Sequence, residues 1–238
     1  MSDADAILAS LAEVARERQR RAADPALGER VRALKQHQQQ RLRGTHADLL
    51  ASPRYRQSAL FFLEELYGPA DFVQRDAQFA RVVPAITRLF PREVVGTVLA
   101  LAQLHALSER LDTEMALAAL DLPDAPDTQR APNPPVLDAA AYGRAWRAVG
   151  QPAERERQIA LTTQIGRALD RHTRSRLLRA SLHMMRAPAR AAGLEALQHF
   201  LESGFDAFGS MGGAEEFLRT IADRERRLAA ALFAGGAG

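Results

Sequence analysis

His105, Glu109 and Asp112 are spaced so that they share one face of a helix, at positions i, i+4 and i+7. An imidazole and two carboxylates so arranged could offer ligands to a metal ion or orient the histidine as a base. A metal needs further ligands, and the sequence has neither a Glu-x-x-His pair nor a His-Glu-x-x-His motif. We therefore predict no metal site, and a hydrogen-bonded structural histidine is the favoured interpretation of His105.

A second group of chemically capable side chains surrounds the junction between two expected helices: Glu64, Glu65, Tyr67, Asp71, Arg75 and Asp76. Paired carboxylates perform acid–base chemistry when their environments separate their pKa values, and Arg75 could keep one of them ionised. Adjacent helical residues diverge by about 100°, however, so Glu64 and Glu65 do not converge on one substrate. An ion-pair network that joins two helices is the favoured interpretation.

Arginines form a third pattern, a basic stripe at helical spacing opposite an apolar face, made of Arg176, Arg179, Arg186 and Arg190. Such a stripe could contact phosphates of nucleic acid or an anionic membrane surface. Acidic residues of the C-terminal helices could equally pair with it, and this intramolecular interpretation is favoured. With 32 basic and 29 acidic side chains, the net charge of +3 does not make nucleic acid the expected partner.

Motifs for nucleophilic or nucleotide chemistry are missing from the sequence. It contains no Gly-x-Ser-x-Gly, Walker or Gly-x-Gly-x-x-Gly pattern, and it has no cysteine. Whether the protein is an enzyme is left open, with a non-enzymatic role favoured. No cofactor is predicted, although an all-α chain could enclose haem, with His105 or His199 as the axial candidate.

The elements that must position these residues are expected to be helices throughout. Ala, Leu, Arg and Glu dominate, β-branched residues are sparse, and no sustained period-two alternation occurs. We predict an all-α, mainly antiparallel multi-helix bundle of about nine helices. Pro84 should interrupt one helix, and another should break near residues 173–175. The expected ranges are 4–22, 26–50, 54–67, 72–89, 92–120, 138–149, 153–186, 189–209 and 213–233.

The distribution of prolines and of apolar residues divides the chain into an arm, a bundle and a connection within the bundle. Residues 121–137 are proline-rich and predict a long crossover between helices. Residues 51–238 are expected to form a single bundle around that connection. Residues 1–50 carry thin apolar stripes and are expected as an N-terminal helical arm that is mobile or packs on a partner. The acidic N-terminus and the lack of a long apolar run predict a cytoplasmic protein without a transmembrane segment.

The segment 59–68 joins an apolar helical face to two carboxylates and ends at Gly68-Pro69. On a helix, Phe61 falls opposite the main apolar arc, so either it is exposed to a partner or the helix is covered on both sides. The sequence Phe-Phe-Leu-Glu-Glu-Leu-Tyr-Gly-Pro at 61–69, together with Arg75-Asp76, resembles the uncharacterised bacterial "FFLEELY motif" proteins. The likeness extends to Leu104–Leu107 and Met211–Gly213, and it implies no particular activity.

These patterns support three hypotheses about function. The favoured one is a non-enzymatic helical binding or interaction protein, whose surface around the 59–68 helix contacts an unknown protein partner or a second copy in a homodimer. An alternative is a helical protein that binds haem or a lipid-like molecule near His105 or Phe61. The other alternative is a regulator that contacts phosphate or nucleic acid through the stripe Arg176–Arg190.

Overall fold

The computed structural model describes residues 1–66, 72–120 and 137–236, and these residues are helical, with no strand among them. The all-α prediction is thereby confirmed. The expected residues Tyr67 and Asp71 lie outside the described residues, as does nearly all of the predicted crossover at 121–137. The first half of the chain contains α1 (Asp3–Ala23), α2 (Pro25–Thr45), α3 (Ala47–Ala51), α4 (Arg56–Phe61), the π-helical segment η1 (Phe62–Leu66), α5 (Val73–Leu89) and α6 (Arg92–Leu120). The second half contains α7 (Ala139–Val149), α8 (Pro152–Thr173), α9 (Arg176–Met184), α10 (Arg186–Ala191), α11 (Glu195–Ser210) and α12 (Glu215–Phe233).

Local sequence signals explain where several helices begin. The Asp24 side chain accepts hydrogen bonds from the amides of Ala26 and Leu27, and Pro25 occupies the first turn of α2, where no N–H is needed. Pro152 likewise occupies the first turn of α8, where no N–H is needed. The helices are more finely divided than the nine ranges expected, because the range 26–50 breaks at His46 and the range 153–186 breaks at 174–175. The latter break was predicted.

Pro84 does not interrupt its helix, which corrects the prediction made from sequence. It lies inside α5, which continues to Leu89. Proline removes one backbone hydrogen bond and disfavours the helix at that point. The neighbouring Val83 is fully buried in a cluster with Ile7 and Val95, and this packing between α5, α1 and α6 offsets the loss.

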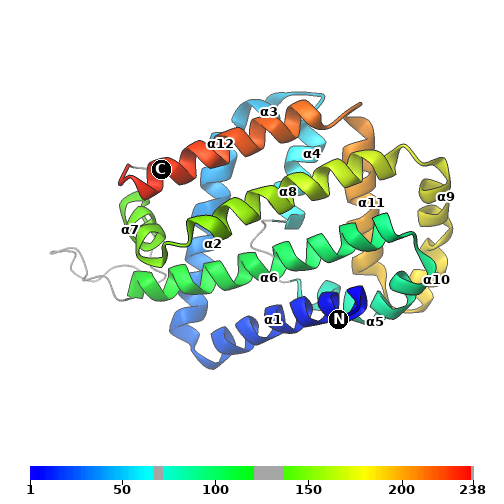
Figure 1. The fold of residues 1–238 in the computed structure, drawn as a ribbon, viewed down its shortest axis with the longest axis horizontal. Coiled ribbons are helices and arrows are strands. Elements are labelled where there is room, and N and C mark those ends of the chain that lie inside the picture. Colours follow the sequence, from blue (N-terminus) through cyan, green and yellow to red (C-terminus); the bar gives the residue numbers. More distant parts are fainter. Residues whose placement is uncertain (67–71, 121–136, 237–238) are drawn as a thin grey trace.

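Helix α6 lies at the centre of the molecule and contacts α1, α2, α7 and α8 (Figure 1). Helices α6, α8 and α12 lie side by side in that order, and neighbouring helices of this layer run in opposite directions (Figure 1). Helices α2 and α11 cross behind them (Figure 1). Residues 1–50, expected as an arm, pack on this framework through α1 and α2, and Ile7, Val14, Leu27 and Val31 are buried there. Among the described residues, no helix combines the length and the apolar character that a membrane span requires.

The segment expected to present Phe61 to a partner contributes to the core instead. Phe61 is 6% exposed and packs against Phe62, Phe200 and Phe208. A Cβ atom at Gly204 of α11 would lie 2.9 Å from the ring tip of Phe61, so only glycine fits without movement. Of the two possibilities that the sequence left open, the structure therefore shows a helix covered on both sides.

A candidate ligand cavity beside a buried polar network

His105 of α6 belongs to a partly buried ion-pair cluster. Its Nε2 atom lies 2.8 Å from Oδ2 of Asp76, and Arg18 of α1 donates to the same oxygen at 2.7 Å. Burial raises the pKa of Asp76, but the hydrogen bond from His105 and the nearby positive charges outweigh it, and the net shift is downward. This arrangement agrees with the hydrogen-bonded structural histidine that the sequence favoured.

Glu109 lies one turn further along α6 and is 5% exposed. Arg21 of α1 and Lys35 of α2 each form an ion pair with one of its oxygens. Burial alone would raise the pKa of Glu109, but the charges of Lys35 and Arg21 lower it to about 2. The carboxylate is therefore ionised at neutral pH and joins three helices through charge-assisted hydrogen bonds.

Asp112 follows on the same face of α6, as the spacing predicted, but its environment differs. Its Oδ1 atom accepts a hydrogen bond from Nε2 of Gln38 at 2.9 Å, and the residue is 7% exposed. Burial raises the pKa of Asp112, and the negative charge of Glu109 adds to this shift. Within the described residues, no group of three or more His, Cys, Asp or Glu side chains is placed to hold a metal ion.

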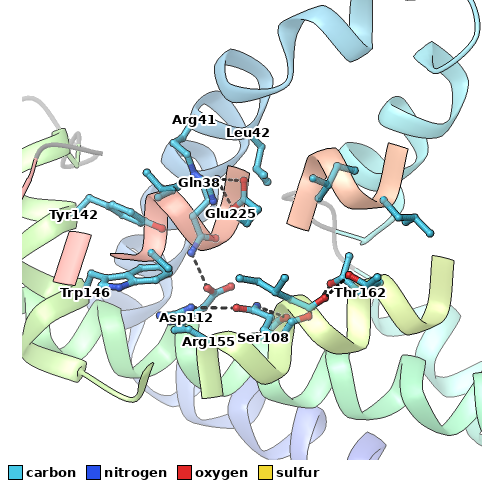
Figure 2. A pocket seen from close by; sticks show the side chains of 17 residues that line it. Gln38, Arg41, Leu42, Ser108, Asp112, Tyr142, Trp146, Arg155, Thr162 and Glu225 are labelled. Carbon is cyan, nitrogen blue, oxygen red and sulfur yellow. Dashed lines mark hydrogen bonds and ion pairs between the residues drawn. The ribbon is translucent and has the colours of Figure 1, made fainter. Parts of the chain in front are cut away.

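Asp112 lines a cavity of about 90 Å³ between α2, α6, α7, α8 and α12 (Figure 2). Polar and charged side chains from all five helices reach its wall, and Figure 2 shows Asp112 facing Gln38 across it. The polar lining consists of Gln38, Arg41, Ser108, Asp112, Tyr142, Trp146, Arg155, Gln158, Thr162, Thr163 and Glu225. Apolar contacts come from residues such as Leu42, Leu218 and Leu228.

Arg41 supplies one of the two positive charges at the cavity, and Glu225 neutralises it. Both oxygens of Glu225 lie 2.6 Å from Nη1 of Arg41, and His46 approaches one of them at 3.1 Å. Burial raises the pKa of Glu225, but the hydrogen bonds from His46 and Arg41 reverse this and lower it. The pair therefore contributes little net charge to the cavity.

Arg155 supplies the second positive charge and has no such counterion. It is 4% exposed, its guanidinium lies 3.9 Å from the ring centre of Trp146, and it forms no ion pair with any described carboxylate. Its Nη2 contacts the Met115 sulfur at 2.9 Å, and its Nη1 reaches Gln158 only at 3.4 Å. Sulfur is a weak acceptor. Burial lowers the pKa of Arg155 from its usual range, although the nearby Tyr142, Asp112 and Glu114 act in the opposite direction.

Several buried donors at the cavity have no hydrogen-bond partner among the described residues. They are Nε of Arg155, Nε of Arg41, Nε1 of Trp146 and the hydroxyl of Tyr142. Tyr142 and Trp146 are 2% and 7% exposed, and burial raises the pKa of Tyr142. Buried polar groups without partners are costly, so an occupant of this cavity is expected to supply acceptor atoms.

The junction group predicted from sequence lies outside the cavity, and its Asp76 joins the His105 cluster, with Oδ1 3.5 Å from Nε of Arg75. Glu65 lies 3.8 Å from Arg75, whereas Glu64 is exposed and lies 3.7 Å from Arg43. The Arg75 guanidinium stacks between the rings of Phe72 and Phe200, and its Nη1 donates to the backbone oxygen of Glu65 at 2.9 Å. The two glutamates therefore diverge, and the arrangement is a link between helices.

The basic stripe is only partly compensated. Arg186 pairs with Glu202 at 2.6 Å, and Arg179 lies 5.9 Å from the ring centre of Phe205. The pairing with an acidic residue of the C-terminal half agrees with the intramolecular interpretation for Arg186.

The cavity itself was missed in the sequence, although parts of it were visible. Tyr142 and Trp146 lie four residues apart, which is the usual spacing of an aromatic pair in a helical core, and Arg155 lies in the charged run Glu154–Arg157, which resembles a solvated helix start. A signal was available: Arg155 is in helical register with Thr162, Ile165 and Gly166, which form the buried stripe of α8. An arginine in line with such a stripe is a candidate for burial.

Fold and site together define an all-α helical bundle with a buried polar network and a small polar cavity. The chain belongs to the family described as "Domain of unknown function (DUF8198)", whose model matches residues 17–238. The match begins just before Arg18 and Arg21, so it includes both arginines that α1 contributes to the network. Comparisons with curated proteins and with solved structures found no match.

Proposed function

We propose that the protein is a non-enzymatic binding protein and that its ligand is a small polar molecule held in the cavity between α2, α6, α7, α8 and α12. One observation carries this proposal. Four buried donors at the cavity wall have no protein partner, although buried polar groups in folded proteins are nearly always satisfied. A ligand with acceptor atoms would satisfy them and would recover the free energy that their burial costs.

The size of the cavity favours a small ligand over the haem or lipid-like molecule considered from the sequence. Pockets for such ligands commonly have volumes of roughly 300–1,000 Å³. This cavity has about 90 Å³, and its accessible lining is mostly apolar with charged and polar groups at a few points. His105, the axial candidate for haem, is hydrogen-bonded to Asp76 and is not among the cavity residues.

An interaction role for the 59–68 helix is the weaker candidate, because the Phe61 ring lies inside the protein. Glu64 is the exposed part of the described segment, and a partner would have to recognise charge there. Contact with phosphate through Arg176 and Arg190 is a further proposal, supported only by their place on the basic stripe. Among the described residues of these two surfaces, no buried side chain lacks a hydrogen-bond partner in the way that those of the cavity do.

The chain carries a reporter for the cavity, because Trp146 is its single tryptophan and lies in the cavity wall. We would titrate ¹⁵N-labelled protein with a panel of molecules of two to six non-hydrogen atoms, and follow the indole N–H resonance of Trp146 together with its fluorescence. At least one panel member is expected to give a saturable shift. Each panel member would be added up to about 100 mM, because a ligand that does not bind at that concentration has a negligible binding free energy. If no member shifts the resonance, the proposal is wrong.

A cavity-filling variant separates binding inside the cavity from binding at the surface. Ala229 of α12 lines the cavity, whereas the next residue, Ala230, is exposed. Ala229→Met should abolish the response of Trp146, because the added side chain occupies the ligand volume. Ala230→Met adds the same side chain to the same helix and should leave the response unchanged. Equal responses of the two variants would place the ligand outside the cavity.

A further inference from the structure

We infer that the ligand is a small planar carboxylate, of about the size of acetate, whose oxygens accept hydrogen bonds from Arg155, Trp146 and Tyr142. This inference rests on the proposed function and narrows it to one chemical class. It follows from three properties of the cavity: its volume, the charge of Arg155 without an ion-pair partner among the described residues, and the hydrogen-bond donors among its unpartnered groups.

The volume limits the ligand to a few atoms. A buried cavity of 150 Å³ holds benzene, which has six non-hydrogen atoms. By the same proportion, about 90 Å³ holds about four. A carboxylate with one carbon substituent has that size.

The charge of the lining favours an anion. Arg41 is neutralised by Glu225, whereas Arg155 has no described carboxylate within ion-pair distance. A buried cation without a partner is strongly unfavourable, and a bound anion would provide the missing charge. Asp112 is the only other acid at the cavity, and its side chain already accepts from Gln38.

Asp112 lies at the same cavity, and its pKa is raised. Burial raises the pKa of Asp112, Glu109 raises it further, and the charges of Lys35 and Arg155 act in the opposite direction. A bound anion would add to the upward shift, because a second negative charge nearby raises the pKa of an acid.

The shape of the donor set favours a planar oxyanion. The ring of Trp146 covers one face of the Arg155 guanidinium, so recognition must use the edge of that plane, where Nε has no partner. Carboxylates bind guanidinium edges in the plane through such N–H groups. Tyr142 lies on α7 one helical turn before Trp146, and both side chains reach the same cavity (Figure 2). An alcohol or amine would leave more of these donors unsatisfied.

The test compares acetate with acetamide, which has the same shape but no charge. Sodium acetate is expected to shift the Trp146 indole resonance saturably, acetamide at least tenfold more weakly, and sodium chloride at equal ionic strength not at all. If acetamide binds as tightly as acetate, the inference is wrong and the proposed function stands. If acetate, acetamide and every other panel molecule leave the resonance unchanged, both are wrong.

Variants locate the carboxylate. Tyr142→Phe removes a hydroxyl that interacts with Arg41 and has no other described partner, and acetate binding should weaken by roughly tenfold while the fold persists. Tyr55→Phe is the matched control, because its hydroxyl binds Glu216 instead of lining the cavity, and acetate affinity should not change. Arg155→Gln should abolish acetate binding. If Tyr142→Phe is well folded and binds acetate as tightly as the unmodified protein, the inferred position of the ligand is wrong.

Discussion

Replacing Glu109 by glutamine would remove the charge that joins α1, α2 and α6 while keeping the shape of the side chain. Arg21 and Lys35, whose side chains are 12% and 18% exposed, would then be buried without their shared counterion. Removing one partner of a buried ion pair typically costs about 3–5 kcal/mol. We therefore expect Glu109→Gln to lower the free energy of unfolding at pH 7 by about that amount.

The pKa of Glu109 gives a second estimate of the same magnitude. A fall from 4.5 to about 2 corresponds, at about 1.4 kcal/mol per unit, to a contribution of roughly 3 kcal/mol. Because the pKa in the folded state is the lower one, this contribution is fully present above pH 4.5. It is lost as the pH falls from 4.5 towards 2. The difference between the unmodified protein and Glu109→Gln should therefore shrink over that interval.

Asp48 provides a matched control, because its pKa is also lowered to about 2, by a hydrogen bond from Arg224. Its side chain is 60% exposed, however, and solvent screens such a pair, so Asp48→Asn should cost less than about 1 kcal/mol. Urea unfolding followed by circular dichroism, at pH 7 and in steps down to pH 3, measures both variants. Equal costs for the two, or a cost for Glu109→Gln that does not change with pH, would refute the reasoning.

Three further substitutions, with Gly96→Ala as a control, test the packing around the 59–68 segment, each by urea unfolding. Gly204→Ala should destabilise by about 1–3 kcal/mol, because its Cβ would meet the Phe61 ring at 2.9 Å, whereas Gly96→Ala, with open space around it, should stabilise by up to about 1 kcal/mol. Equal effects would contradict the close contact. Phe61→Ala should cost about 3–5 kcal/mol, and a cost below 1 kcal/mol would mean that the ring is not buried in solution. Arg75→Lys should cost about 1–2 kcal/mol, because an ammonium cannot stack flat on Phe72, and an unchanged midpoint would argue against stacking.

The helical secondary structure could be predicted because it depends on local sequence. The same holds for the shared helix face of His105, Glu109 and Asp112. Periodicity and proline position determine them within a few turns of the chain. The partners of these residues could not be predicted in this way. Asp76, Arg21 and Lys35 lie 29 to 88 residues away from the α6 residues they contact. Spacing along one helix contains no information on which other helix will face it.

The Phe61 and Pro84 results show how tertiary packing overrides a local pattern. The helical arc of the 59–68 segment placed Phe61 on a polar side, but α11 covers that side because Gly204 lets the two helices approach closely. Pro84 weakens α5 locally, but burial of Val83 stabilises the helix on that side. In each case the deciding residue belongs to another element or to the buried face, and a single-helix argument omits it.

The network and the cavity are physically connected through α2 and α6. Lys35 and Gln38 are three residues apart on α2, and they bind Glu109 and Asp112, which are three residues apart on α6. These two contacts fix the register of α2 against α6 at this point. Glu109 and Asp112 thereby link the ion-pair network to the wall of the cavity, because Gln38 and Asp112 both line it.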